Sequence, residues 1–366
     1  MNRLSGLDLL RAIAILWVML FHSWIVGGLG DPFQPIGDYG WMGVDLFFVL
    51  SGYLIGYQVL KPLSLRQPLH FAEFYRRRTY RILPAFLVVL AVYAWFPSWR
   101  EAPGMQPAWQ FLTFTLNLLI DYQHNEAFSH AWSLCVEEQF YLVFPALAWL
   151  LTRRPSLPVT LCVGSVIVAA GMLLRAYAAR HNLDYLENIY YPTYTRLDGL
   201  LAGVTLAAIQ AYRPSVWSLL QRNGNILTLI GLAVVGIAIW LFRDRLTFMP
   251  SVFGFPLLSF GIALLVAACA GRQGLGRWRV PGTGWIAGMS YSLYLSHKLA
   301  LHAVARWLAA HPAVHGWVAF VLYAVAITLL GTLLHYGVEQ PFLRLRDRRA
   351  ASRMPAAIGQ ADVSAG

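Results

Sequence analysis

Ten apolar stretches, each about as long as a transmembrane helix, constrain the fold of this chain more than any other feature. A helix needs about 20 mainly apolar residues to cross the hydrocarbon core of a bilayer. Only 12% of the residues are charged, whereas a soluble domain carries about 25%. We therefore predict an all-α integral membrane protein with about ten transmembrane helices, and we exclude soluble, disordered and disulfide-rich secreted proteins. The predicted spans cover approximately residues 7–26, 41–60, 82–99, 131–151, 156–174, 196–212, 226–242, 252–270, 284–302 and 317–336.

The distribution of basic residues predicts how these spans are oriented. Cytoplasmic loops of membrane proteins are enriched in Lys and Arg, and ten spans with both termini in the cytoplasm place most of the 28 basic residues on that side. The net charge of +11 then reflects topology, so we predict no nucleic-acid partner. A further apolar segment, 109–120, is too short to cross the bilayer and would reverse the charge bias if it did. We predict a short re-entrant or interfacial segment there.

The two ends of the chain are predicted to carry no soluble domain. Asp8 and Arg11 interrupt the first apolar run and no small-residue cleavage site follows it, so we interpret this run as a retained span and not as a signal peptide. We predict one membrane domain over residues 1–346. Residues 347–366 begin with basic side chains and continue with small and polar ones, which predicts a disordered cytoplasmic tail.

Ionisable side chains inside the predicted spans are the first candidate functional residues, because a charge at mid-bilayer costs at least about 2.5 kcal/mol. Asp8, Arg11 and His22 lie on one stripe of the first span, with Arg11 toward the cytoplasm and His22 near the outer end. Asp45 of the second span lies at a depth similar to that of His22. An imidazole beside a carboxylate is a suitable general base. The alternative is that His22 and Asp45 only satisfy each other between packed helices.

The fourth span begins with a polar helical face. Ser133, Glu137 and Tyr141 follow one another at intervals of four residues, and His130 lies one turn before them. Glu137 and Glu138 cannot both face lipid, so at least one of them points into the bundle or into a hydrated cavity. The alternative is that the two carboxylates are structural hydrogen-bond anchors.

A basic run precedes the third span, and it contains Arg78 and Arg81 at a spacing of three residues. On a helix these two guanidinium groups share a face, and paired guanidinium groups suit phosphate because each offers a planar fork of donors. The run therefore predicts a cytoplasmic phosphorylated ligand. The alternative is that it only anchors the loop on the cytoplasmic side.

Three further features are weaker. Arg196 and Asp198 begin the sixth span but do not face each other on a helix. His297 and Lys298 lie near the outer end of the ninth span, where the alternative is that they reach the lipid headgroups. The three cysteines lack a partner at a metal-ligand spacing, so we predict no metal site.

These residues belong to a series of motifs in a fixed order along the chain. Together the motifs resemble the acyltransferase-3 family of bacterial membrane O-acyltransferases, over roughly residues 7–346. The series consists of Leu7-Asp8-x-x-Arg11 followed by His22, Gly43-Val44-Asp45, Arg78-x-x-Arg81, Trp132-Ser133-Leu134-x-x-Glu137, Tyr294-x-x-His297 and Val338-Glu339-Gln340-Pro341.

The resemblance implies a membrane domain of about ten helices in the bacterial inner membrane that transfers an acyl group, usually acetyl, from cytoplasmic acyl-CoA. The acceptors are usually hydroxyl groups of surface or exported glycans, free or lipid-linked. In that family the Arg and His at the spacing of Arg11 and His22 are linked to activity, and Arg78 and Arg81 match its Arg-x-x-Arg element. Some members carry a fused extracytoplasmic domain. We expect the stand-alone form here, acting directly or through a separate acyl-relay protein.

On this basis we assign roles to ten residues. Arg11, Arg78 and Arg81 are predicted to bind acetyl-CoA, chiefly through its phosphates. His22, oriented by Asp45, is the predicted general base or acyl carrier, and Glu137 is predicted to position the acceptor or share its proton. The residues assigned to substrate binding are Ser133, Tyr141, Arg196 and His297.

Two alternatives to acetyl transfer stay open from the sequence. A proton-coupled transporter or exporter of a sugar or lipid-linked sugar would also need His, Asp and Glu side chains inside the membrane. An enzyme that transfers succinyl or a longer acyl group would share the same residues.

Overall fold

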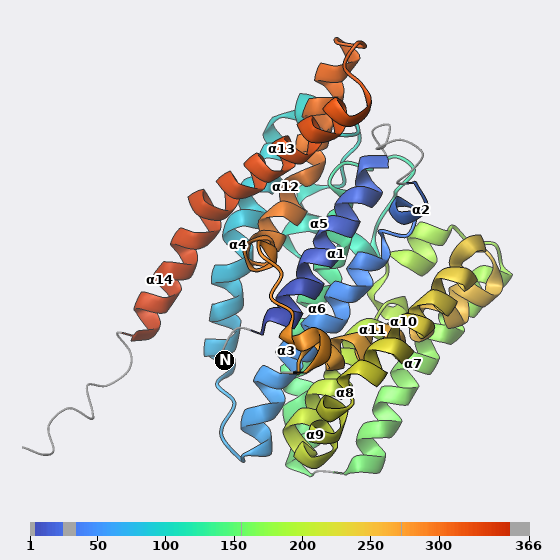
Figure 1. Ribbon diagram of the computed structural model, residues 1–366, viewed down its shortest axis with the longest axis vertical. Helices are drawn as coiled ribbons and strands as arrows, with labels where there is room; N and C mark the ends of the chain where they lie inside the picture. The colour runs from blue at the N-terminus through green and yellow to red at the C-terminus, as the bar shows by residue number, and fades with distance from the viewer. Residues whose placement is uncertain (1–3, 25–33, 155, 272, 352–366) are drawn as a thin grey trace, which may run out of the picture.

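The structure, a computed structural model, describes residues 4–24, 34–154, 156–271 and 273–351. Within these ranges the chain is helical and contains no strand, only an isolated bridge between Met105 and Ala127. Figure 1 labels the helices. They are α1 (Ser5–Trp24), α2 (Gln34–Gly37), α3 (Met42–Ser64), α4 (Phe71–Trp95), α5 (Ala108–Leu112), α6 (Trp132–Arg153), α7 (Leu157–Arg180), α8 (Asp198–Tyr212), α9 (Pro214–Arg222), α10 (Gly224–Leu241), α11 (Phe255–Cys269), α12 (Thr283–Ala309), α13 (Gly316–Leu334) and α14 (Gln340–Ala351).

Among the described residues, eight helical segments are long and apolar enough to span a membrane, which confirms the prediction of an all-α integral membrane protein. They match eight of the ten predicted spans. The other two, 196–212 and 284–302, form α8 and α12. Helix α8 has only 15 residues, and α12 buries polar side chains that include Ser292, His297 and Lys298. The number of crossings therefore stays a prediction.

The segment predicted to be re-entrant or interfacial contains no long helix. It forms the five-residue α5 and a short 3-10 turn at Leu116–Leu118. Phe111 and Leu116 are buried, whereas Trp109 and Leu112 are exposed. Short helices with one buried and one exposed apolar side agree with a segment that does not cross the bilayer. Further along the chain, residues 347–351 continue α14, and the rest of the predicted tail, 352–366, lies outside the described residues.

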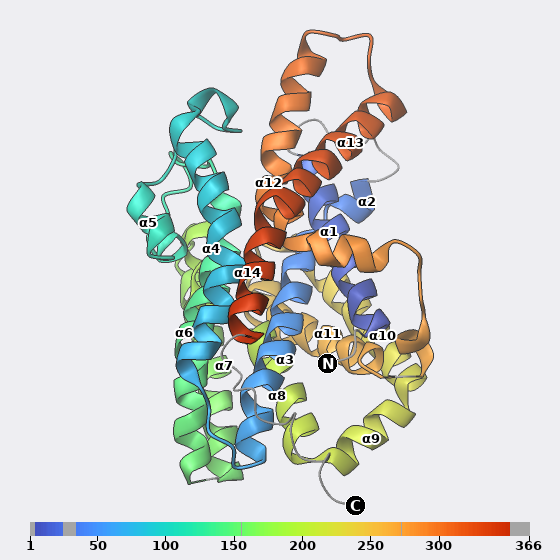
Figure 2. The ribbon, with the colours of Figure 1, turned by 90° about the vertical axis from the view of Figure 1, so that its left-hand side faces the viewer.

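Helices α1 and α3 lie in the middle of the bundle, with α4, α12 and α13 on one side and α7, α10 and α11 on the other (Figures 1 and 2). In the apolar part of the span that contains α3, 72% of the residues are buried by other helices, against 6% for α7. Helix α7 is therefore the candidate span that the described part of the chain covers least. Helices α3 and α8 approach closely through glycine, because a Cβ atom at Gly52 would lie 2.1 Å from the carbonyl oxygen of Leu200.

A buried ion pair fastens α7 to α8. Arg175, one residue beyond the predicted span 156–174, is fully buried. Its Nη1 donates to Asp198 Oδ2 at 2.7 Å and its Nη2 to Asp198 Oδ1 at 3.2 Å. Nη2 also donates to the carbonyl of Val252 at 3.3 Å, in the π-helical turn before α11. A bidentate pair of this kind fixes both the distance and the rotation of the helices that it joins.

We predict that Asp198→Asn destabilises the protein by about 3–5 kcal/mol, because it leaves the Arg175 guanidinium buried without its counter-charge. Thermal or chemical unfolding of the purified protein in detergent measures this. Asp244→Asn, which changes an exposed carboxylate, is the matched control and should leave stability unchanged. Equal stability of both variants would contradict a structural role for the pair.

Candidate functional site

An elongated cavity of about 760 Å³ runs along α3, within the range of small-molecule sites, about 300–1,000 Å³. Its lining follows one face of α3, from Val44 through Ser51 and Gln58 to Pro62. At about 1.5 Å per residue this face extends for about 27 Å, so the cavity is as long as a membrane-spanning segment. One end lies at the connection between α3 and α4, where His70 contributes to the lining. The other end is closed by Ser133 and Tyr294.

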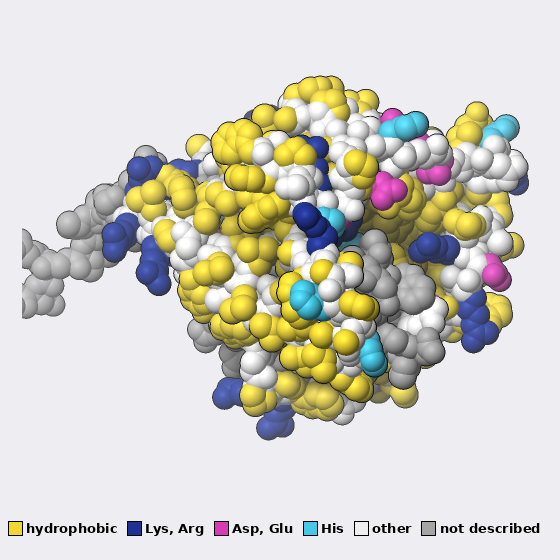
Figure 3. Space-filling model, turned by 90° about the horizontal axis from the view of Figure 1, so that it is seen from above, with side chains coloured by type: hydrophobic (Ala, Val, Ile, Leu, Met, Phe, Trp, Pro, Cys, Tyr) yellow, Lys and Arg dark blue, Asp and Glu magenta, His cyan; other side chains and the backbone are white. Residues whose placement is uncertain are grey.

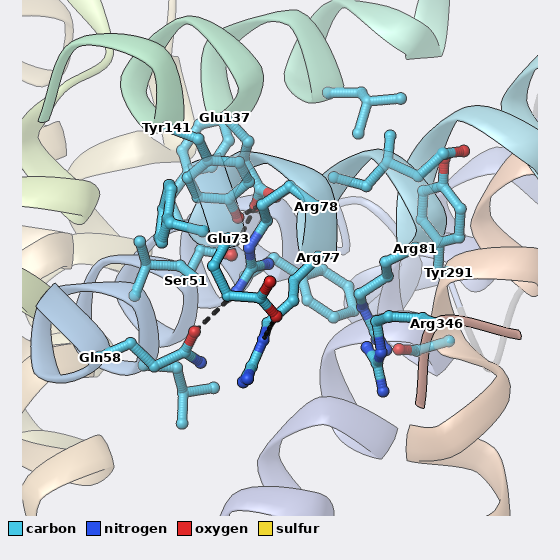
Figure 4. Close-up of a pocket in the computed structure, with 18 of the residues that line it drawn as sticks. Ser51, Gln58, Glu73, Arg77, Arg78, Arg81, Glu137, Tyr141, Tyr291 and Arg346 are labelled. Atoms are coloured by element: carbon cyan, nitrogen blue, oxygen red, sulfur yellow. Dashed lines mark hydrogen bonds and ion pairs between the residues drawn. The ribbon is translucent and has the colours of Figure 1, made fainter. Parts of the chain in front are cut away.

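Arginine side chains gather at the end of the cavity near the α3–α4 connection. Figure 4 shows Arg77, Arg78, Arg81 and Arg346 around the cavity, with Glu137 and Tyr141 next to Arg78. The first three come from one face of α4 and the fourth from α14. Arg77 Nε contacts Glu73 at 2.7 Å, so the local charge is partly compensated. Five arginines line the cavity against three carboxylates: Arg11, Arg77, Arg78, Arg81 and Arg346 against Glu73, Glu137 and Asp347.

Aromatic and acidic neighbours hold Arg78 and Arg81 in place. The Arg78 guanidinium lies 5.0 Å from the centre of the Tyr141 ring, and its Nη2 donates to Gln58 Oε1 at 3.4 Å. Stacking of this kind orients a guanidinium while its edge stays open to a ligand. Arg81 Nη1 lies 4.0 Å from Glu339 Oε1. Glu339 is buried and accepts from Ser292 at 2.7 Å, so α4 and α12 are joined through one carboxylate.

The polar face predicted on the fourth span lines the same cavity. Glu137 accepts a hydrogen bond from Ser51 Oγ at Oε1 and one from Tyr141 Oη at Oε2, each at 2.8 Å. Ser133 Oγ lies 2.6 Å from Tyr294 Oη, which donates to the carbonyl of His130 at 2.7 Å. Because that bond uses the only hydroxyl proton of Tyr294, Ser133 is the donor to Tyr294. This hydrogen-bonded pair forms the closed end.

Three imidazole rings lie directly beyond the closed end, and we call His22, His130 and His297 the histidine cluster. The ring of His297 is 4.8 Å from that of His22 and 4.9 Å from that of His130. His22 Nδ1 and His297 Nε2 are 2.8 Å apart. The Tyr294 ring is 5.5 Å from His130 and 5.8 Å from His297. One aromatic side chain therefore separates the cavity from the cluster.

A buried ammonium group adjoins the histidine cluster. Lys298 Nζ lies 3.5 Å from Glu101 Oε1 and donates to Ser129 Oγ at 3.3 Å. The side chain therefore points into the protein, not toward lipid headgroups. Figure 3 looks down on the end of the molecule opposite the α3–α4 connection, and basic and histidine side chains gather in a hollow near the middle of that face. In the part of the chain that the structure describes, no group of three or more His, Cys, Asp or Glu side chains could hold a metal ion.

The predicted pair of His22 and Asp45 does not form. Asp45 Oδ1 instead accepts from Arg196 Nη2 at 2.7 Å, and both side chains are buried. Gly43 of α3 lies against the middle of α1, so Asp45, two residues further along α3, is well below His22 and on the other side of its helix. Arg196 is also surrounded by aromatic rings, the nearest being Phe255 at 4.2 Å and Tyr190 at 4.5 Å. Neither Asp45 nor Arg196 lines the cavity, so the geometry opposes their assignment as a catalytic and a substrate-binding residue.

The remaining predicted residues fall into two neighbouring groups. Six line the cavity, namely Arg11, Arg78, Arg81, Ser133, Glu137 and Tyr141. His22 and His297 belong to the histidine cluster. The sequence analysis assigned no role to His130 or Tyr294, although both lie within the quoted motifs or next to them. Tyr294 could have been found, because it lies one helical turn before His297 and therefore on the same side of α12.

We predict that Asp45 and Arg196 act as a structural unit. Asp45→Leu leaves an uncompensated buried guanidinium and should cost about 3–5 kcal/mol, whereas Asp45→Leu combined with Arg196→Met should recover most of that loss. Unfolding of the purified variants in detergent measures the coupling. If the stability losses of Asp45→Leu and Arg196→Met, each measured alone, simply add in the double variant, the two side chains do not stabilise each other and the prediction is wrong.

Comparisons with known proteins agree with this arrangement. A family model described as an acyltransferase domain, that of the acyltransferase-3 family, matches residues 4–336. O-acetyltransferase OatA of Staphylococcus aureus strain NCTC 8325 / PS 47 is 27% identical over 387 residues, which cover 98% of this chain and 60% of that protein. OatA of strain MRSA252 is 27% identical over 382 residues, with 96% and 59% covered. The chain thus spans about 60% of the length of these relatives. No solved structure matches it significantly. The chain belongs to the acyltransferase-3 family.

Proposed function

We propose that this protein is a membrane O-acetyltransferase that takes acetyl-CoA from the cytoplasm and acetylates a hydroxyl group of a surface or exported glycan. One observation carries the proposal: an arginine-lined cavity ends one side chain short of the histidine cluster. Acyl-CoA has the matching shape, with phosphates at one end and a thioester at the end of a long, narrow arm. Membership of the acyltransferase-3 family disfavours the transporter alternative.

The cavity suits the donor along its whole length. Arg77, Arg78, Arg81 and Arg346 supply guanidinium groups for phosphate, which forms strong charge-assisted hydrogen bonds with them. The face of α3 then offers mostly apolar contacts to the pantetheine arm, with Ser51 and Gln58 as polar exceptions. This orientation puts the thioester near Ser133 and Tyr294. The Lys- and Arg-rich loops predicted on the cytoplasmic side lie at the same end as the arginines, which is why we propose that the donor enters from the cytoplasm.

The histidine cluster suits the transfer step. His22 takes the proton of the acceptor hydroxyl, whose oxygen bonds to the thioester carbonyl carbon. The C–S bond then breaks, and the thiolate of CoA receives the proton from His22, so that atoms and charge balance. The neighbouring Lys298 adds positive charge near the developing oxyanion. A variant of this mechanism has His22 carry the acetyl group briefly before the acceptor attacks.

The acceptor approaches from the opposite face. The name of the similar S. aureus proteins, O-acetyltransferase OatA, supports acetyl transfer to oxygen. We propose a glycan hydroxyl, free or lipid-linked, at the outer face of the bacterial cytoplasmic membrane, with lipid around the bundle. Two routes are distinguishable. In the direct route the purified chain acetylates the glycan alone, and in the relayed route it needs a separate extracytoplasmic protein. Mass analysis of the glycan separates acetyl from succinyl or longer groups.

We predict that Arg78→Ala and Arg81→Ala each weaken acetyl-CoA binding by about 10- to 100-fold, because a hydrogen bond to a charged group contributes about 1.5–3 kcal/mol. Calorimetric titration of the detergent-purified protein with acetyl-CoA measures this. Arg344→Ala is the matched control, since Arg344 is exposed on α14 and does not line the cavity. Unchanged binding in both cavity variants would contradict the donor site.

We predict that His22→Ala loses at least about 100-fold in transfer while it still binds acetyl-CoA, because a general base contributes about 10²–10⁴-fold to the rate. The readout is alkali-labile acetate on the surface glycan of cells that carry each variant in place of the wild type. His311→Ala changes an exposed histidine and should retain full acetylation. Full acetylation by His22→Ala would rule out this mechanism.

A further inference from the structure

The histidine cluster contains a hydrogen-bond chain whose direction follows from its ends. His297 Nδ1 lies 2.7 Å from the carbonyl oxygen of Tyr294, and His297 Nε2 lies 2.8 Å from His22 Nδ1. A carbonyl oxygen can only accept a hydrogen bond, so His297 carries its proton on Nδ1. A neutral His297 therefore presents an unprotonated Nε2. His22 must then donate from Nδ1, which leaves its own Nε2 without a proton.

The surroundings favour neutral rings before the reaction. His297 is fully buried. Among the described residues the hydrogen bonds of His22 and His297 go to each other and to main-chain carbonyls, not to a carboxylate. Glu101, a carboxylate near the cluster, is already paired with Lys298. Burying an additional unpaired cation beside that ammonium group would be costly.

We propose that His297 is a positioning residue that fixes His22 in the tautomer with the proton on Nδ1, so that Nε2 is the proton acceptor in transfer. The inference rests on the proposed function for its catalytic meaning, but the tautomer itself does not. The sequence analysis gave the orienting role to Asp45, which Arg196 holds elsewhere. A second imidazole, oriented by a main-chain carbonyl, replaces the expected carboxylate.

The arrangement gives the transfer step a defined proton path. Nε2 of His22 accepts the hydroxyl proton as the new C–O bond forms, and it returns that proton to the thiolate sulfur as the C–S bond breaks. Throughout, His22 Nδ1 donates to His297 Nε2. The positive charge that His22 acquires is therefore shared with a polarisable second ring, and the ring cannot rotate away from the thioester. No other proton enters or leaves.

His130 provides an internal reference, because its contacts indicate the opposite tautomer. Its Nε2 lies 3.4 Å from the carbonyl of Leu295, so Nε2 carries the proton. Its Nδ1 is buried and has no hydrogen-bond partner within the described part of the chain. His22 and His130 thus differ in tautomer although they lie in one cluster.

Nitrogen-15 NMR of histidine-labelled protein in lipid nanodiscs tests the tautomers directly. The His22 signals are identified by their loss in His22→Gln, and those of His130 by their loss in His130→Gln. We expect His22 protonated on Nδ1 and His130 on Nε2 in the wild type. In His297→Leu, His22 should change to a mixture or to the Nε2 form, while His130 keeps its tautomer. Wild-type His22 protonated on Nε2 would overturn the proposal, whatever the protein catalyses.

Kinetics of conservative variants test the consequence. His297→Gln keeps a donor for the Tyr294 carbonyl and an acceptor for His22, whereas His297→Leu keeps neither. We expect His297→Gln to retain transfer within about 10-fold and His297→Leu to lose at least about 100-fold, with acetyl-CoA binding unchanged in both. Equal transfer by the two variants would overturn the positioning role. Failure of the wild type to bind acetyl-CoA would instead refute the proposed function and leave the tautomer result intact.

Discussion

Charges inside a bilayer must be neutralised by a partner or kept in contact with water, and this requirement organises the whole bundle. Two buried arginines are fully committed to partners. Arg175 is held by Asp198, and Arg196 is held by Asp45. These pairs add charged contacts between helices that also pack through apolar surfaces. The arginines along the cavity are different, because they face a space large enough for a ligand. Arginine thus has two uses in this bundle: it forms ion pairs between helices, and it lines the cavity.

The helical membrane fold and six of the residues that line the cavity could be predicted from the sequence, because the patterns behind them are local to the chain. Apolar length sets the spans, and a spacing of three or four residues puts Arg78 with Arg81, and Ser133 with Glu137, on shared faces. These patterns do not depend on how one helix is rotated against another. The resemblance to the acyltransferase-3 family rested on the same ordered motifs, and the family match over residues 4–336 confirms it.

What the sequence could not predict is which faces meet. The sequence placed His22 and Asp45 at similar depths, but Asp45 lies nearer the middle of the bundle. There it pairs with Arg196, and His22 pairs with a residue 275 positions away. The apolar length of 196–212 predicted a span, and the structure has a helix of 15 residues there, α8. This helix approaches α3 closely at Gly52, and no periodicity in the sequence indicates that contact. Long-range pairings of this kind depend on the rotation and shift of whole helices, so they become visible only in three dimensions.

One continuous site is proposed to connect the arginine-lined donor cavity with the histidine cluster. The most direct test is a cryo-electron microscopy structure of the protein in nanodiscs with a non-hydrolysable acetyl-CoA analogue. We expect density for the phosphates beside Arg78 and Arg81, and the acyl end at Ser133 and Tyr294, next to His22. Density for the nucleotide at the opposite face, or an acyl end directed away from the histidine cluster, would contradict it.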